Sequence, residues 1–215
     1  MFYRPRRSTA DHISRSATAS VSPPVLARAH QSLKFINQGL ARMSTRAEAG
    51  IPEELRSRAS FMPYDFFTPQ PVRGADVYLF HWIFHGWSDE YGVRILRSQI
   101  PALKKGARIL INEWCLPEPG GMVDGMRALC GESLLSTSTE NLTRCRSTMD
   151  LLMLTVVNSN ERDLDMWREL FNKADPNFAF LGASQPEGCR MWTIETVWDQ
   201  DKEFSEKDAL PGALF

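Results

Sequence analysis

Two short apolar runs, each followed by polar residues, stand out in the middle of the chain. Residues 77–80 (VYLF) and 109–111 (ILI) are apolar throughout, which is typical of strands buried on both faces of a parallel sheet. Between them, Ser88 can cap a helix whose apolar positions over residues 93–103 recur at helical spacing. A strand, a helix and a strand of these lengths form a βαβ unit. The pattern therefore predicts an α/β fold with a parallel sheet.

The rest of the chain shows further helix and strand signals. Pro52 and the two glutamates after it predict the start of a short helix. The helix after Ser88 is expected to end at the KKG sequence of residues 104–106, and Asp163 is expected to cap a helix over residues 163–174. The other predicted elements are helices within 25–47 and over 148–157, and strands over 60–62, 178–181 and 191–198, the last two joined by a turn at 186–188.

Composition and charge are those of an ordinary soluble globular protein. The 215 residues are 43% hydrophobic and 24% charged, enough for one domain with a sizeable core. Residues 1–47 carry eight of the 25 lysines and arginines but only one of the 26 acidic residues. The remainder is therefore acidic, which gives no reason to expect nucleic-acid binding. We expect residues 1–47 to be a basic, largely disordered or helical extension, and residues 199–215 to be a flexible tail.

Cysteine spacing and hydropathy indicate the cellular compartment in which the protein is expected. The four cysteines lie far apart, with no CxxC pair and no neighbouring histidines; they are Cys115, Cys130, Cys145 and Cys189. This spacing fits neither a metal site nor a disulfide scaffold, so we expect free thiols, no bound metal and a cytoplasmic protein. No apolar run reaches the ~18 residues of a membrane-spanning helix. The Arg- and Ser-rich start is also compatible with a mitochondrial transit peptide, but it shows no convincing amphipathic helix.

Three polar residues are candidates for chemistry. His85 follows the strand predicted at 77–80, and Glu113 follows the strand predicted at 109–111. Ligands of open α/β sheets bind beyond the carboxyl ends of the strands, so an acid and a histidine leaving adjacent parallel strands can meet there. Glu161 lies between two predicted helices, where its side chain can also reach inward. Taken alone, each has a simpler interpretation: a hydrogen-bonded structural histidine, a solvated carboxylate and a helix cap.

Four longer segments are far more specific than any single spacing. They are FHWIFHGWSDE (80–90), ARILINEWCLPEPG (107–120), MDLLMLTVVNSNERDLDMWRELF (149–171) and FMPYDFFTPQPVRGADVYLF (61–80). Together they resemble the plant and fungal small-molecule O-methyltransferases, whose catalytic histidine commonly lies in the motif W-I-x-H-D-W-S-D-E. The resemblance covers residues 50–198 in the right order, with two low-match gaps, and on it the chain is identified as a member of that family.

The resemblance implies a reaction that needs no metal. A methyl group of S-adenosylmethionine would pass to a hydroxyl, usually a phenol, of a small aromatic secondary metabolite. His85 would take the hydroxyl proton as general base. Glu113 and Glu161 match the family's two glutamates, which orient the imidazole and stabilise its protonated form.

The same resemblance suggests residues that contact the two ligands. Asp65 and Phe66 match the family's Asp-hydrophobic pair at the adenine of the cofactor. His81 occupies the position where many plant members have a lysine near the cofactor. Met153 and Asn158 resemble substrate-facing residues. For Phe66 and Met153, ordinary core packing is the alternative interpretation.

The chain also departs from the family. Gly86 stands where the residue after the histidine is usually Asp. Residues 1–60 contain no match to the family's glycine-rich strand-turn, nor to the acid that ends the next strand; the only glycines there are Gly39 and Gly50. We therefore expect an incomplete Rossmann-like class I methyltransferase fold over residues 48–198, with a parallel sheet and a terminal antiparallel strand pair.

Three interpretations stay open at this point. The chain is an O-methyltransferase of secondary metabolism, either truncated in the recorded sequence or with an unusual cofactor site; or it is an inactive remnant; or it is a non-catalytic partner of a full-length methyltransferase. A homodimer also stays open, although the family's helical dimerisation domain has no match. The low-match segment 120–147 is either a true insertion or non-coding sequence read through in the gene.

Overall fold

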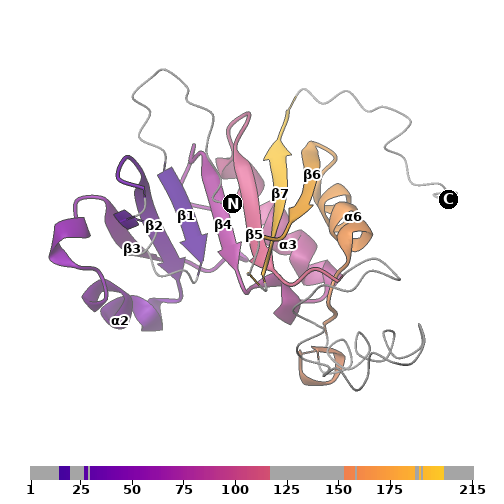
Figure 1. Cartoon of the computed structure of the whole chain (residues 1–215), viewed down its shortest axis with the longest axis horizontal. Coiled ribbons are helices and arrows are strands. Elements are labelled where there is room, and N and C mark those ends of the chain that lie inside the picture. Colours follow the sequence, from indigo (N-terminus) through magenta and orange to yellow (C-terminus); the bar gives the residue numbers. More distant parts are fainter. Residues whose placement is uncertain are drawn as a thin grey trace, which may run out of the picture.

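A computed structural model of the chain describes residues 15–19, 27–28, 30–116, 153–157, 159–186, 189 and 191–200. Its centre is a seven-stranded sheet of order β3-β2-β1-β4-β5-β7-β6 (Figure 1). The strands are β1 (Arg15–Ala19), β2 (Lys34–Gly39), β3 (Ala59–Pro63), β4 (Val77–His81), β5 (Arg108–Glu113), β6 (Phe178–Ser184) and β7 (Trp192–Trp198).

The first five strands run parallel, and the last two are antiparallel to their neighbours. β1 pairs in parallel with both β2 and β4, and β4 pairs in parallel with β5. β7 then lies antiparallel between β5 and β6. This arrangement confirms the predicted α/β fold with a terminal antiparallel pair. Strands β1 and β2 come from residues before position 48, so the segment expected to be an extension contributes to the sheet.

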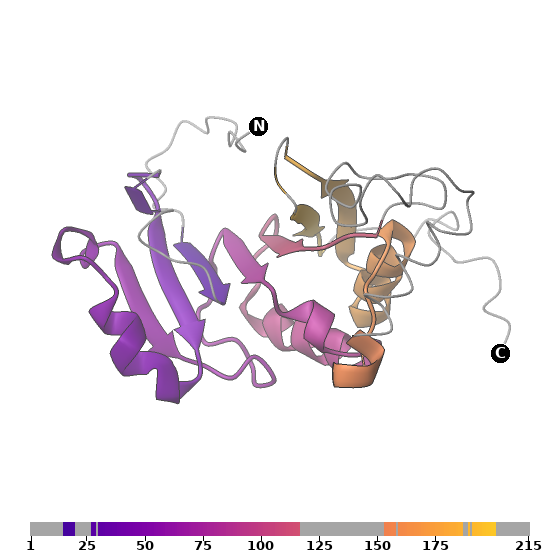
Figure 2. The same ribbon diagram turned by 60° about the horizontal axis from the view of Figure 1, so that its bottom comes forward.

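Two amphipathic helices cover the part of the sheet around β4, β5 and β6. Helix α3 (Asp89–Gln99) and helix α6 (Leu164–Ala174) lie side by side, as Figure 2 shows. The main core joins these helices to the strands through residues that are all buried: Tyr78, Phe80, Ile95, Leu96, Ile109, Ile111, Trp167, Leu170, Phe171, Phe178, Ile194 and Trp198. The described parts of the chain contain no helix that is both long and apolar enough to cross a membrane.

A smaller core lies under the β2–β3 side of the sheet. It contains Phe35 of β2, Leu55 of the 3-10 turn η2 (Glu53–Leu55) and Ala59 of β3. The guanidinium of Arg58 donates hydrogen bonds to the backbone carbonyls of Ala27, His30 and Leu33, at 2.9, 3.1 and 3.2 Å. Because one side chain bonds three carbonyls, these bonds tie the segment before β2 to the residue that precedes β3.

Two secondary-structure predictions were wrong. Of the described residues within 25–47, only Ala27, Arg28 and the start of α2 (Ser44–Ala49) are α-helical. Residues 34–39 form β2 instead, because pairing with strands on both sides outweighs the local helical spacing. The helix after Ser88 ends at Gln99 rather than at 104–106. Pro101 ends it, since proline has no amide proton to continue the helix, and a 3-10 turn η4 (Ile100–Ala102) follows.

Other predictions are confirmed. The Pro52 segment opens the short 3-10 turn η2, and Asp163 caps α6 by accepting a 2.9 Å hydrogen bond from the backbone N–H of Met166. Ser88 is the N-cap residue of α3, but its side chain makes no capping hydrogen bond. Residues 153–157 are helical, whereas 148–152 and the turn residues 187–188 lie outside the described residues.

The α3–α6 contact gives a direct test of the fold. Leu170 is fully buried, and its side chain lies against Gly92 of α3. We expect Leu170→Ala to lower the free energy of unfolding by about 2–5 kcal/mol, because it leaves a cavity between the two helices. Leu181→Ala is the matched control: Leu181 is 55% exposed on β6, and its loss should cost within about 0.5 kcal/mol. Equal losses in urea titrations of the two variants would contradict the described packing.

Candidate active site

The candidate catalytic residues lie at the carboxyl ends of two adjacent strands. β4 and β5 run parallel and in register, so their carboxyl ends lie at the same edge of the sheet. Glu113 is the last residue of β5. His85 lies just after β4, in the 3-10 turn η3 (Phe84–Gly86), which leads into α3. The sequence-based expectation that strand ends bring these two residues together is therefore confirmed.

The Glu113 carboxylate is bonded to the backbone of the turn that carries His85. The residue is only 1% exposed. One carboxylate oxygen accepts from the backbone N–H groups of Ile83, at 2.6 Å, and Phe84, and the other accepts from the backbone N–H of His85 at 2.8 Å. A tight turn leaves its first amides without backbone partners, and here one carboxylate satisfies three of them. Glu113 therefore fixes the position of the turn.

Glu113 also lies beside the imidazole ring. Nδ1 of His85 is 3.6 Å from the nearer carboxylate oxygen, and the His85 side chain is 26% exposed. The Glu113 carboxylate, 3.6 Å from Nδ1, is the largest influence on the pKa of His85 and raises it. Burial and the charge of Arg162 lower this pKa, but the charges of Glu113 and Glu161 raise it, and the net shift is upward.

The second ring nitrogen is the one available for a ligand. With Nδ1 towards Glu113, the favoured neutral tautomer carries its proton there, which leaves Nε2 as an acceptor. Trp82 packs edge-on against the imidazole, with ring centroids 5.1 Å apart. Trp82 itself has a φ of 55°, a left-handed conformation that bulky residues rarely adopt, and is 52% exposed. Backbone strain of this kind gathers at functional sites, and no sequence signal pointed to it.

Arg162 is a further element of the site that sequence reasoning did not single out. It is 1% exposed, and its guanidinium donates to the backbone carbonyls of Phe84 at 3.0 Å and Trp87 at 2.8 Å. It also pairs with the Asp89 carboxylate at 2.9 Å. The arginine thus bonds carbonyls of the same segment whose amides Glu113 bonds. Glu161 and Arg162, neighbours in the sequence NERD, are both buried. The carbonyls that Arg162 bonds lie more than 70 residues away in the chain, so no local pattern indicated this role.

The other predicted site residues are spread more widely. Asp65 is exposed, and its carboxylate accepts a 3.0 Å hydrogen bond from the backbone N–H of Phe67, which closes a turn. His81 Nδ1 lies 2.7 Å from the side-chain oxygen of Asn112 on the neighbouring strand. Met153 is half-buried in the helical segment 153–157, and Asn158 lies outside the described residues.

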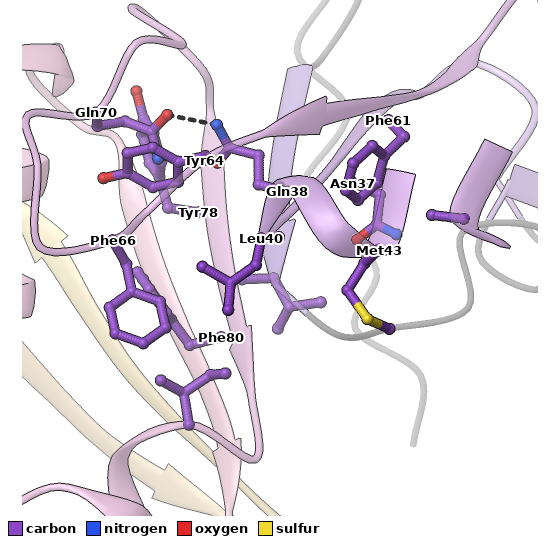
Figure 3. Close-up of a pocket in the computed structure, with 14 residues that line it drawn as sticks. Asn37, Gln38, Leu40, Met43, Phe61, Tyr64, Phe66, Gln70, Tyr78 and Phe80 are labelled. Atoms are coloured by element: carbon purple, nitrogen blue, oxygen red, sulfur yellow. Dashed lines mark hydrogen bonds between the residues drawn. The ribbon is translucent and has the colours of Figure 1, made fainter. Parts of the chain in front are cut away.

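A cavity of about 270 Å³ lies at the same edge of the sheet, beside the turn (Figure 3). Its walls come from the end of β2, the segment 40–47 that follows it, the middle of β4 and the loop after β3, and most are apolar, with Phe66 among them. Its lining residues are Asn37, Gln38, Gly39, Leu40, Met43, Ala47, Phe61, Tyr64, Phe66, Gln70, Tyr78, Leu79, Phe80 and Ile83, and none carries a charge. Neither Asp65 nor His81 is among them. Across the residues the structure describes, no three His, Cys, Asp or Glu are grouped to hold a metal ion.

The chain matches the model of the O-methyltransferase domain family over residues 24–176. It belongs to that family. It is 40% identical over 187 residues to the grayanic acid biosynthesis cluster O-methyltransferase of Cladonia grayi, covering 86% of this chain and 38% of that protein. It is also 40% identical over 177 residues to the chlorophenol O-methyltransferase of Trichoderma longibrachiatum, covering 81% and 34%. The chain thus spans well under half the length of these relatives.

Solved structures with the same fold support this placement. The O-methyltransferase domain superposes on LepI in complex with SAM with a TM-score of 0.68, at 22% identity, over 90% of this chain and 45% of that one. It superposes on NcsB1, an O-methyltransferase from neocarzinostatin biosynthesis solved with S-adenosylmethionine and 2-hydroxy-5-methyl naphthoic acid, with a TM-score of 0.65, at 23% identity, over 86% and 49%. At these identities the likeness concerns the fold.

The family uses S-adenosylmethionine. The cavity of this O-methyltransferase domain suits one part of that cofactor and not another. The apolar walls of the cavity, with Phe66 and Phe61, suit a flat, uncharged adenine ring. Ribose hydroxyls are usually held by an acid at the end of the second strand of such sheets. Here β2 ends at Gly39, and no lining residue supplies a carboxylate. The described residues therefore fit the base and do not fit the ribose.

The contact between Glu113 and His85 should be measurable as a shift in the pKa of His85. In the native protein the His85 pKa should lie above the ordinary value of ~6.5, and in Glu113→Gln it should fall because the negative charge is lost. Since the folded-state pKa is the higher one, the pair stabilises the fold fully below the unfolded pKa. That contribution is lost as the pH rises through the folded pKa.

Histidine-selective NMR titration measures the pKa of His85. Urea titrations at about pH 6 and about pH 8, on either side of the histidine pKa, measure the linked change in the free energy of unfolding. The variant Glu195→Gln is a control, because Glu195 pairs with Arg108 on the neighbouring strand β5 instead. An unchanged His85 pKa in Glu113→Gln would contradict the proposed interaction.

Proposed function

We propose that this chain transfers a methyl group to a phenolic hydroxyl of a small aromatic secondary metabolite, with His85 as general base. The single observation that carries the proposal is the His85–Glu113 pair at the carboxyl edge of a methyltransferase sheet. The relatives support the reaction type, since their names describe O-methyltransferases and one of them acts on a chlorophenol. Because the chain spans under half of their length, the activity of this chain is itself part of the proposal.

The proposed role of His85 is to remove a proton that would otherwise stay on the substrate. A phenol has a pKa near ~10 and an ordinary histidine near ~6.5, so the transfer is uphill. Glu113 reduces this difference, because its buried negative charge raises the pKa of His85. The same charge stabilises the imidazolium once it forms. When bound, S-adenosylmethionine supplies an electrophilic methyl group on a positively charged sulfur.

Other residues take supporting roles in this proposal. Glu161, which is 6% exposed, adds a second negative charge that favours the protonated imidazole. Met153 and Asn158 would face the substrate. Phe66 would contact the adenine, supported by its position in the cavity wall.

Asp65 and His81 would then act near the cofactor from outside the cavity.

Two further proposals concern the setting of the chain. We propose a homodimer, or pairing with a longer relative, and a cytoplasmic, reducing setting. The free thiols of Cys115 and Cys189 support the second of these. Burial raises the pKa of the Cys115 thiol to about 12, so this cysteine would stay unreactive.

The second candidate function is a chain that no longer transfers methyl groups and serves as a partner of a longer methyltransferase. One specific observation favours it: the cavity offers no carboxylate for the ribose of the cofactor. In that case the turn around His85 would be retained for its structural bonds alone.

A radiolabel assay separates the two candidates. With methyl-labelled S-adenosylmethionine at saturation and a chlorophenol as acceptor, the chain should release labelled ether, and His85→Ala should lower the rate by about 10²–10⁴-fold. Cofactor affinity should stay nearly unchanged, because His85 is not in the cavity wall. The matched control is His30→Gln, since His30 contributes only its backbone carbonyl to Arg58.

Retained transfer in His85→Ala would overturn the assignment of the base. Bound cofactor without transfer to any phenol tested would favour the non-catalytic candidate over the enzyme.

A further inference from the structure

The carboxyl end of β2 forms one wall of the cavity. β1 lies between β2 and β4 in the sheet. On one side of β1 the sheet continues with β2 and β3, and on the other side it continues with β4 and β5. In open α/β sheets this switch point is where ligands bind. The cavity spans it, because its lining comes from Asn37 to Gly39 on one side and from Tyr78 to Phe80 on the other.

We infer that Gly39 limits how tightly this chain holds the ribose of its cofactor, and that a carboxylate at position 39 would restore that contact. The inference rests on the proposed function, because it takes S-adenosylmethionine as the ligand of the cavity.

The polar groups already in the cavity are poorly suited to a diol. The amides of Gln38 and Gln70 bond each other reciprocally, at 2.8 and 2.9 Å, as Figure 3 shows in part. Gln70 also donates to the side chain of Gln99 at 2.9 Å, so these buried amides form a closed network. The side-chain oxygen of Asn37 is a buried acceptor without a partner. One amide oxygen can accept from one hydroxyl, whereas two neighbouring hydroxyls are best matched by the two oxygens of a carboxylate.

The backbone at position 39 leaves room for a side chain. A Cβ added to Gly39 would lie 3.6 and 3.7 Å from ring atoms of Phe61, which is ordinary van der Waals contact, and Gly39 has no left-handed φ. Gly92 differs, since a Cβ there would meet Leu170 at 3.2 Å. The hydrogen bond that the Gly39 carbonyl accepts from the backbone N–H of Tyr64 does not involve a side chain. Glycine is therefore not required at position 39 by sterics or by backbone conformation.

The test is isothermal titration calorimetry of the full chain with S-adenosylhomocysteine, the demethylated form of the cofactor. Gly39→Asp should tighten binding by about tenfold or more, because a carboxylate gains charge-assisted hydrogen bonds to the ribose. Gly39→Asn is the matched control of the same size without charge and should gain much less. A 2′,3′-dideoxy analogue of the ligand should show no difference between wild type and Gly39→Asp.

An unchanged or weaker affinity in a folded Gly39→Asp, judged by circular dichroism, would overturn the inference. Absence of binding to both proteins would overturn it as well, since position 39 would then not be limiting. A gain that persists with the dideoxy analogue would also contradict the proposed contact with the ribose. Failure of the proposed function has a different signature: S-adenosylmethionine binds, but no phenol is methylated.

Discussion

One buried carboxylate organises the edge of the sheet that carries the candidate active site. Glu113 accepts hydrogen bonds from the backbone N–H groups of three consecutive residues, 83 to 85. One of its carboxylate oxygens also lies 3.6 Å from Nδ1 of His85. Burying a carboxylate is costly unless its lone pairs are bonded, and here three amides satisfy them. The same bonds that offset its desolvation also fix the histidine, so local stability and placement of the proposed base have one origin.

The carbonyls of this turn are bonded by a buried cation. Arg162 bonds the carbonyls of Phe84 and Trp87 and pairs with Asp89 at the start of α3. The turn is thus held by a carboxylate on its amides and a guanidinium on its carbonyls. The turn that carries His85, the proposed base, is therefore held in place by side chains of this chain. The proposed cofactor cavity differs, because β2 ends at Gly39 and none of the lining residues supplies a carboxylate.

Sequence reasoning worked where a residue's role follows from its neighbours in the chain. The runs 77–80 and 109–111 are apolar enough to predict buried parallel strands, and polar residues just beyond such strands meet at one sheet edge. That logic brought His85 and Glu113 together. It also predicted the cap at Asp163, which needs only a local hydrogen bond.

The failures came where long-range contacts decide. Residues 15–19 (RSATA) contain no large apolar side chain, so β1 is defined by its pairing with β2 and β4. The interior role of Arg162 depends on carbonyls more than 70 residues away in the chain. Likewise, the significance of Gly39 emerges only once the sheet order shows that it borders the cavity. No local pattern encodes these relations.

The central claim is that Glu113 holds the turn of His85 through its backbone amides. Amide hydrogen exchange followed by NMR tests it most directly, at the N–H groups of Phe84 and His85. Both amides should be strongly protected in the wild type and exchange much faster in Glu113→Ala, while amides in the middle of α6 stay protected. Equal protection of the two amides with and without the carboxylate would contradict it.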